Sequence, residues 1–210
     1  MCCVLCAVGL FFSFSRAAWL GLAAGLLVMI FFMAWQRDIV RLKKMAGIIL
    51  PAVAVIFILS ILYNNLVFTR LASPGCLEAK SNIERVESYK FAWDIIKKNW
   101  LFGVGIGNYT LALKNEISLK RQGYYYQPVH NTFLLVWAET GFFGLLFFIF
   151  YLLFTVYCLL KNVKSKENFN SYKIILLAAL FVIFMVDHWL WSLHFGILFF
   201  WLVFGIIKKG

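Results

Sequence analysis

The sequence predicts an all-α membrane protein, a polytopic bundle of transmembrane helices. Hydrophobic residues make up 63% of the 210 residues and aromatic residues 19%, whereas ordinary soluble domains are roughly half apolar. The apolar residues form long runs separated by short basic clusters, and a helix that crosses a bilayer core needs about 20 apolar residues. We therefore treat residues 1–210 as a single membrane domain.

Six apolar runs are the candidate spans, and the first and fifth of them are short for a crossing. The first run lacks a basic n-region and a small-residue cleavage site, so a removable signal peptide is not expected. An opening methionine followed at once by membrane sequence indicates a chain that has lost an N-terminal portion. The six runs cover residues 1–15, 17–35, 46–63, 132–160, 174–187 and 189–207.

The short connecting segments orient these spans, because Lys and Arg concentrate in loops on the cytoplasmic side. Segments 36–44 and 161–173 each carry four Lys or Arg residues, and two lysines lie near the C-terminus. This orientation places Arg16, the large loop 64–131 and the corner at residues 187–188 together on the outer side. The net charge of +11 is thus explained by membrane topology, and nucleic-acid binding is not expected.

The large outer loop carries a helical pattern of aromatic residues. Four apolar positions recur at steps of three or four residues, which places them on one face of a helix. We interpret this segment as a helix that lies in the membrane interface and is anchored there by its aromatic side chains. The four positions are Tyr89, Trp93, Ile96 and Trp100.

A glycine-rich stretch, "GVGIGNY", follows this helix. Gly103, Gly105 and Gly107 allow a tight backbone path that a bulky residue would not accept. The spacing does not fit a dinucleotide-binding fingerprint, since the third glycine of GxGxxG would fall on Asn108. We therefore expect a tight loop here.

The stretch "PVHNTFLLVWAETGFFG", residues 128–144, puts His130 and Asn131 at the start of a span. Proline disfavours helix in the residue before it, so the span begins here, and Asn131 or Thr132 is a plausible N-cap. His130 is then either an interface residue or a proton-transfer group. Glu139 lies roughly 13 Å further along the helix and about half a turn round, which indicates a buried packing partner for another helix.

Arg16 and Arg85 are each ordinary when considered alone, one as an arginine at the end of a span and the other as a surface charge. Topology, however, places both on the same side of the membrane as His130. Two permanent cations suit an anionic, membrane-bound substrate, because the guanidinium fork matches phosphate oxygens. A nearby neutral histidine suits proton abstraction from an attacking hydroxyl.

The last outer turn gathers three further ionisable residues, Asp187, His188 and His194. They are candidates for lining a cavity. Trp189 and Trp191 beside them, however, are typical of an interfacial aromatic belt, and we favour that interpretation.

Other chemistries lack their motifs. Cys3 and Cys6 form a CxxC, but no second CxxC or nearby histidine completes a metal set, so the cysteines are interpreted as small apolar residues. The chain has no HExxH and no DxD, and its nine acidic residues are dispersed along the sequence. A GxSxG elbow of a serine hydrolase is also absent. We therefore predict no metal site and no cofactor.

Three motifs in order and spacing carry a resemblance to a known family: "SRAAWLGL", then "ER" and "FAWDIIKKNWLFGVGIGNY", then "HNTFLLVWAETGFFG". The sequence resembles the O-antigen ligase and O-antigen polymerase superfamily. The resemblance covers about residues 10–160 and continues, less specifically, through "DHWLWSLHFGILFFWL".

The resemblance implies a metal-independent, inverting glycosyltransferase with a helical fold of the GT-C kind in the bacterial inner membrane. Its donor would be a glycan on undecaprenyl diphosphate, and its acceptor would be lipid A core, another glycan or a protein hydroxyl. The family has about twice this number of spans, so the resemblance implies that the N-terminal half is absent and leaves the activity of this portion alone in doubt.

The family's functional positions fall on Arg16, Arg85 and His130. The resemblance further implies that Asn131 fixes the imidazole or caps the helix. The three glycines would let the outer loop close over the diphosphate; they are Gly103, Gly105 and Gly107.

Two alternatives come from other classes of protein. A transporter or flippase for lipid-linked glycan would also need arginines for phosphate, but would place some of them within the spans and has no evident need for a proton acceptor such as His130. A non-catalytic membrane subunit would tolerate alanine at Arg16, Arg85 and His130.

Overall fold

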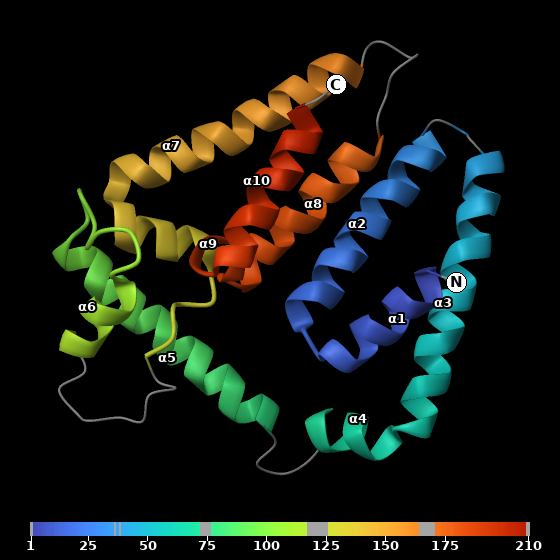
Figure 1. Cartoon of the computed structure of the whole chain (residues 1–210), viewed down its shortest axis with the longest axis horizontal. Helices are drawn as coiled ribbons and strands as arrows, with labels where there is room; N and C mark the ends of the chain where they lie inside the picture. Colours follow the sequence, from blue (N-terminus) through green and yellow to red (C-terminus); the bar gives the residue numbers. More distant parts are fainter. Residues whose placement is uncertain are drawn as a thin grey trace.

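The structure is a computed structural model, and it describes residues 2–35, 37, 39–71, 77–116, 126–163 and 171–208. Every regular element in these ranges is an α-helix, which confirms the predicted all-α class (Figure 1). The helices are α1 (Cys2–Ser13), α2 (Arg16–Trp35), α3 (Ile39–Leu62), α4 (Asn64–Leu71), α5 (Leu77–Lys98), α6 (Tyr109–Glu116), α7 (Thr132–Val163), α8 (Ser171–Val186), α9 (Trp189–Ser192) and α10 (His194–Lys208).

Three of the described helices are long and apolar enough to cross a membrane. The segments with this length and composition are Arg16–Trp35, Lys43–Leu62 and Thr132–Leu159. Shorter apolar helices occupy the positions of the remaining predicted spans, namely Cys3–Ser13, Lys173–Val186 and His194–Ile207. The structure thus supports a membrane protein, and the count of six spans stays a prediction.

The last predicted span is divided in the structure. We expected one continuous run over 189–207, but α9 ends before Leu193, whose backbone is extended with φ −104° and ψ 137°. The two helices meet closely, because a Cβ at Gly196 would collide with the carbonyl group of Trp189. Hydrophobic periodicity alone could not reveal this break, since both sides of it are apolar.

Helix α2 packs against α8 through a stripe of small residues (Figure 1). Ala17, Gly21 and Gly25 recur every four residues and are buried. A Cβ at Gly21 would lie 3.0 Å from Cγ1 of Ile183, and a Cβ at Gly25 would lie 3.3 Å from Cγ2 of Ile175. Small residues at such spacing let two membrane helices approach closely.

Two hydrophobic clusters hold the rest of the described chain. One joins α7, α8, α9 and α10 around stacked and edge-on rings that include Phe148, Phe184 and Phe200. The other joins α5, α6 and the first part of α7. Trp191 on α9 packs against both clusters, so the short helix α9 links α5 and α6 to the apolar bundle.

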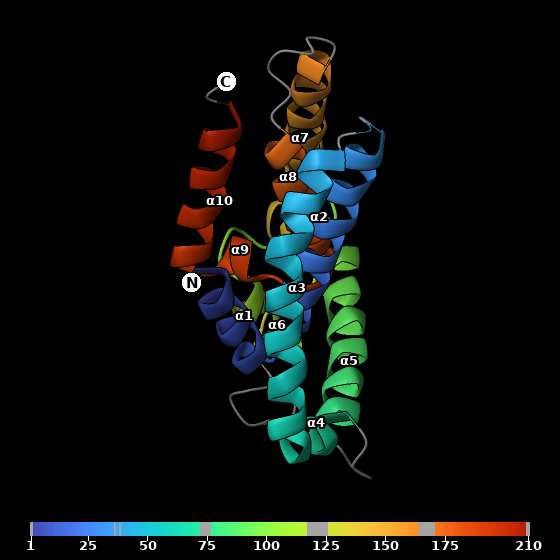
Figure 2. The same ribbon diagram turned by 90° about the vertical axis from the view of Figure 1, so that its right-hand side faces the viewer.

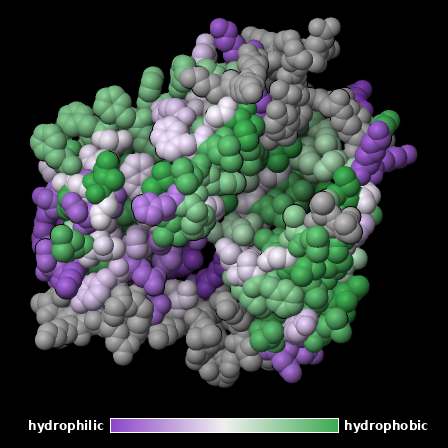
Figure 3. All heavy atoms as spheres, viewed as in Figure 1, coloured by the Kyte–Doolittle hydropathy of each residue, from purple (hydrophilic) through white to green (hydrophobic). Residues whose placement is uncertain are grey.

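Several helix ends gather at two opposite ends of the molecule. The C-terminal ends of α2, α7 and α10 lie at one end of the molecule in both views, and α4 lies at the other (Figures 1 and 2). Hydrophobic residues dominate the surface around α1 and α3, whereas hydrophilic residues gather over α5 and α6 and around a hollow beside α5 (Figure 3). The sides of the membrane to which these ends belong remain a prediction.

The predicted outer helix is present as α5, but its aromatic face is only partly turned outward. Trp93 is exposed, whereas Ile96 is 2% exposed and lies in the α5–α6–α7 cluster. The Tyr89 hydroxyl donates a hydrogen bond to the backbone carbonyl of His130, just before α7. Trp100 lies beyond the C-terminal end of α5. Part of this face packs against protein and part is exposed, and the membrane-interfacial position of α5 stays a prediction.

Helix α7 is broken at Gly141, where φ is 72° and ψ is −170° (Figure 1). The glycine-rich loop fills the break: the N–H groups of Val104 and Gly105 donate to the carbonyls of Ala138 and Glu139 at 2.9 and 2.8 Å. Phe142 N–H, at the start of the second part, donates to the carbonyl of Trp100 at 2.8 Å. The loop therefore satisfies backbone groups that a broken helix would otherwise leave unpaired.

Candidate functional site

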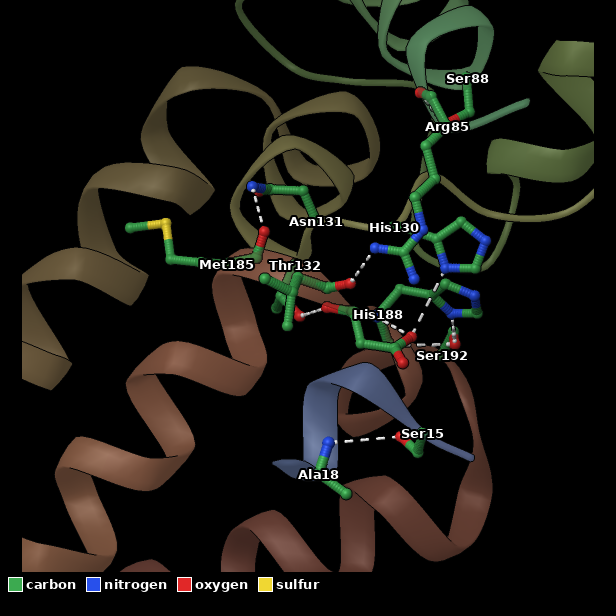
Figure 4. A network of polar contacts seen from close by, with 12 residues as sticks. Ser15, Ala18, Arg85, Ser88, His130, Asn131, Thr132, Met185, His188 and Ser192 are labelled. Atoms are coloured by element: carbon green, nitrogen blue, oxygen red, sulfur yellow. Dashed lines mark hydrogen bonds and ion pairs between the residues drawn. The ribbon is translucent and has the colours of Figure 1, made fainter. Parts of the chain in front are cut away.

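The candidate site lies where α7 begins and α8 ends. Asn131 Oδ1 accepts the N–H of Leu134 at 3.0 Å, which confirms Asn131 as the N-cap of α7. Asn131 Nδ2 donates to the carbonyl of Met185 at 3.1 Å, and Thr132 Oγ1 donates to the carbonyl of Asp187 at 2.8 Å (Figure 4). These two bonds fix the start of α7 against the end of α8.

This junction brings two histidines and a carboxylate together. His130 Nδ1 lies 3.6 Å from Asp187 Oδ1, which is an ion-pair distance but too long for a hydrogen bond. The imidazole rings of His130 and His188 have centroids 5.1 Å apart. Asp187 Oδ1 also accepts the backbone N–H of His188 at 2.8 Å, and His188 Nδ1 lies 2.6 Å from Ser192 Oγ. The carboxylate therefore contacts the imidazole of His130 and the backbone N–H of His188.

Arg85 reaches this junction from α5 (Figure 4). Its Nη1 donates to the carbonyl of Val186 at 3.3 Å. Among the described residues, Arg85 Nε and His130 Nδ1 are buried side-chain atoms without a hydrogen-bond partner. Buried polar groups are nearly always paired in native proteins, so these two atoms are polar groups at this corner whose hydrogen bonds the described protein does not complete.

Arg16 approaches the same helix from the first residue of α2. Ser15 Oγ caps α2 by accepting the N–H of Ala18 at 3.3 Å, and Arg16 Nη1 donates to Asn82 Oδ1 at 2.6 Å. Asn82 lies three residues before Arg85 on α5 and therefore on a neighbouring part of the same face. Arg16, Arg85 and the backbone of His130 thus all lie along one stretch of α5, at Asn82, Arg85 and Tyr89.

Opposing influences act on the Asp187 carboxyl. Burial raises the pKa of Asp187, but the side chain of His130, the N–H of His188 and the charges of both imidazoles together lower it below its usual value. Asp187 is therefore ionised at neutral pH.

At His188 the surroundings favour the neutral form of the side chain. Burial is the main cause that lowers the pKa of His188 to about 4. The charges of His130 and Arg85 lower this pKa further, and together they outweigh the charge of Asp187, which raises it. His188 is thus neutral at pH 7. The corner pairs a neutral imidazole with an ionised carboxylate.

We expect the thermal stability of the protein in detergent micelles to fall as the pH drops from about 6.5 towards about 4. In this window the unfolded chain binds a proton at His188, whose ordinary pKa is 6.5, while the folded protein does not until about pH 4. His188→Gln stays neutral throughout and should show a smaller fall in Tm. Melting curves of both proteins at pH 7 and pH 4.5 measure the difference, and parallel falls would contradict the assignment.

The same corner could hold a metal ion. Among the described residues, His130, Asp187 and His188 each offer one ligand atom, and these atoms lie within 4.8 Å of one another. Two histidines and one carboxylate are a common ligand set for zinc and iron. Although the acidic residues are dispersed along the sequence, the fold brings possible metal ligands together. Metal independence therefore stays a prediction.

The three predicted glycines lie away from these side chains. Gly103 and Gly105 contact the break in α7, and an added Cβ at Gly107 would meet nothing within 4 Å. Both ends of the Asn131 amide are engaged within the protein. Contacts of these four residues with a substrate stay predictions.

Glu139 has the structural role expected from the sequence. It is 5% exposed and accepts a hydrogen bond from Trp191 Nε1 at 2.9 Å. The prediction of a buried packing partner for another helix is confirmed.

Sequence reasoning undervalued Asp187 and His188. The adjacent tryptophans pointed to an interfacial belt, whereas the structure places both residues against His130. The available signal was topology, since the argument that placed Arg16, Arg85 and His130 on one side also placed residues 187–188 there. His194 is exposed at the start of α10, so it fits the surface interpretation.

The fold and the site together define an all-helical membrane protein with a cationic, histidine-containing corner. The O-antigen ligase family matches residues 1–149, and the chain belongs to this family. The protein is therefore of the class that transfers glycans in polysaccharide and lipopolysaccharide biosynthesis. No curated protein and no solved structure matches the chain.

Proposed function

We propose that the protein transfers a glycan from an undecaprenyl-diphosphate carrier to an acceptor hydroxyl at the outer face of the bacterial inner membrane. The observation that carries the proposal is the convergence of Arg85, His130 and Asp187, with Arg85 Nη1 on the carbonyl that precedes Asp187. Family membership supports glycan transfer in general. The carrier, the acceptor and the side of the membrane are proposed.

In the proposed reaction, the acceptor hydroxyl gives its proton to His130 and its oxygen forms a bond with the anomeric carbon of the donor sugar. The bond between that carbon and the diphosphate oxygen breaks, and its electron pair leaves with the carrier diphosphate. Attack from the side opposite the leaving group inverts the anomeric centre. No oxidant, reductant or cofactor is required for this balance.

His130 is suited to the role of the base. Its Nδ1 faces Asp187, and its other ring nitrogen points away from that carboxylate (Figure 4). Asp187 is a positioning residue in this scheme, because its charge stabilises the imidazolium that forms when the proton is taken.

Arg85 and Arg16 are suited to the leaving group. Arginine binds phosphate oxygens through parallel N–H donors and stays charged at every physiological pH. The guanidinium of Arg85 lies beside His130 and Asp187, and we propose that it binds a diphosphate oxygen there. Fixed donors of this kind stabilise developing negative charge because they need no reorientation during the reaction.

The first test is transfer from a labelled undecaprenyl-diphosphate glycan in membranes that contain the protein expressed from its complete gene. Arg85→Ala is expected to lower the transfer rate by about 10²–10³-fold, the usual effect of removing a donor to a developing anion. Lys97→Ala is the matched control, since it removes an exposed cation from the same helix. An unchanged rate in Arg85→Ala membranes would exclude the diphosphate role.

The same assay with EDTA tests the chemistry separately. We expect the wild-type rate to persist, because the scheme uses only protein side chains. A rate that EDTA abolishes and zinc restores would instead assign His130, Asp187 and His188 as metal ligands. If neither the Arg85 variant nor the His130 variant changes the rate of transfer, the result would favour the alternatives, a transporter or a non-catalytic membrane subunit.

A further inference from the structure

His130, Asp187 and His188 are spaced much as the ligands of one metal ion are. Nitrogen and oxygen ligands lie about 2.0–2.2 Å from zinc in a tetrahedral arrangement, so two ligand atoms of one ion are about 3.4 Å apart. His130 Nδ1 lies 3.6 Å from Asp187 Oδ1, which is too long for a hydrogen bond but close to this spacing. With one atom of His188, all three ligand atoms lie within 4.8 Å of one another, so small side-chain rotations complete the set.

Hydrogen bonds within the protein hold these ligands in place. Thr132 donates to the backbone carbonyl of Asp187 at 2.8 Å, which ties the start of α7, and with it His130, to the end of α8. The Ser192 hydroxyl donates to the carbonyl of His188 at 3.2 Å, so its oxygen is left to accept from His188 Nδ1 at 2.6 Å. In that tautomer Nε2 of His188 keeps a lone pair. Histidines that bind metals are commonly oriented in this way, by a partner on the other ring nitrogen.

The ligand types favour zinc over magnesium or calcium. Two imidazoles and one carboxylate are typical zinc ligands, whereas Mg²⁺ and Ca²⁺ prefer oxygen ligands alone. The guanidinium of Arg85 lies beside this corner and opposes a cation (Figure 4). We therefore expect zinc to bind reversibly here.

An ion at this position takes the nitrogen of His130 that faces Asp187. A neutral imidazole carries one proton, on one of its two ring nitrogens. When Nδ1 gives its lone pair to zinc, that proton lies on Nε2, and the ring then has no lone pair for the proton of an attacking hydroxyl. Zinc at this corner and base catalysis by His130 are therefore mutually exclusive.

We propose that His130, Asp187 and His188 form a reversible zinc site that switches off glycan transfer. Binding of zinc needs only these three side chains, whereas its effect on the transfer rate rests on the proposed function. Zinc is an inhibitor in this scheme, so the scheme agrees with a transfer reaction that uses only protein side chains.

Zinc binding to the protein expressed from its complete gene and purified in detergent tests the site without any transfer reaction. Titration against a chromophoric zinc indicator gives the affinity. We expect His130→Ala, Asp187→Asn and His188→Ala each to weaken zinc binding by at least about 10–100-fold, since loss of even an outer-sphere partner has that effect. Arg85→Ala removes the opposing cation and should tighten the binding of zinc.

The controls remove possible zinc ligands from other parts of the chain. His194→Ala and Cys3→Ser/Cys6→Ser replace exposed residues on α10 and α1 and should leave the affinity unchanged. Co²⁺ bound to the wild-type protein should give the visible absorption of a tetrahedral ion with nitrogen and oxygen ligands, a measurement that needs no variant. Wild-type protein that binds no zinc, or ligand variants that keep the full affinity, would overturn the site.

Transfer assays in membranes test the effect of the bound ion. Saturating Zn²⁺ is expected to lower the wild-type transfer rate by about 100-fold or more, the contribution of a general base, and EDTA should restore the rate. Mg²⁺ should leave it unchanged. A transfer rate that bound zinc leaves unchanged or raises would overturn the inhibition, whereas the proposed function fails separately, through the Arg85 and His130 variants assayed without zinc.

Discussion

Replacing His130 with alanine is expected to lower the rate of glycan transfer by about 10²–10⁴-fold, the usual contribution of a positioned general base. The loss should fall on kcat, because His130 is assigned to proton transfer, whereas binding of the donor diphosphate is assigned to Arg85 and Arg16. Single-turnover transfer from the labelled carrier, in membranes with equal amounts of inserted protein, measures this step directly.

The controls for His130 come from the same part of the chain. His194→Ala removes an exposed histidine at the start of α10 and should leave the rate unchanged. Asp187→Asn keeps an oxygen for the N–H of His188 but removes the charge that faces His130. Its loss should be smaller, about tenfold to a hundredfold, because Asp187 acts through His130.

A wild-type rate in inserted His130→Ala protein would refute the assignment of His130 as the base.

Local features of the site were predictable from the sequence because they depend on neighbours along the chain. The proline at position 128 and the cap at Asn131 define the start of α7 without reference to any other helix. Topology then placed Arg16, Arg85 and His130 on one side. Charge sorting between loops is a local property of sequence, so the sidedness of these residues could be predicted from it.

The partnership of Asp187 with His130 was not predictable in this way. It depends on the end of α8 meeting the start of α7 through Thr132 and Asn131, which is a tertiary contact across more than fifty positions. An aspartate beside tryptophans fits an interface belt equally well. Similarly, the face of α5 that contains Ile96 has the same periodicity whether it meets lipid or protein.

The glycine-rich loop shows the same division between local and tertiary information. The sequence indicated a tight backbone path, and the positive φ values of Gly103, Gly105 and Gly107 agree with it. The partner of the loop lay in another motif, at the break in α7. Only the assembled structure shows that "GVG" and "ETG" fit each other backbone to backbone.

The interlocked loop and helix predict the largest effect on folding. Gly141 has φ 72° and ψ −170°, a region that is essentially restricted to glycine. A Cβ at Gly103 would collide with the carbonyl of Glu139, and a Cβ at Gly141 would collide with the carbonyl of Leu101. Because both obstacles are backbone atoms, they cannot move aside as a flexible side chain does.

Gly103→Ala and Gly141→Ala are therefore each expected to destabilise the fold by at least about 3 kcal/mol, the sum of backbone strain and overpacking. Gly107→Ala is the matched control: its φ is also positive, at 77°, but its added Cβ meets nothing within 4 Å, so only about 1–2 kcal/mol of strain applies. Yield of monodisperse protein and Tm in detergent measure the order. Equal yields and equal Tm values for all three variants would mean that the glycine-rich loop does not fill the break in α7. The placement of Glu139 and Trp191 beside that break would then lose its support.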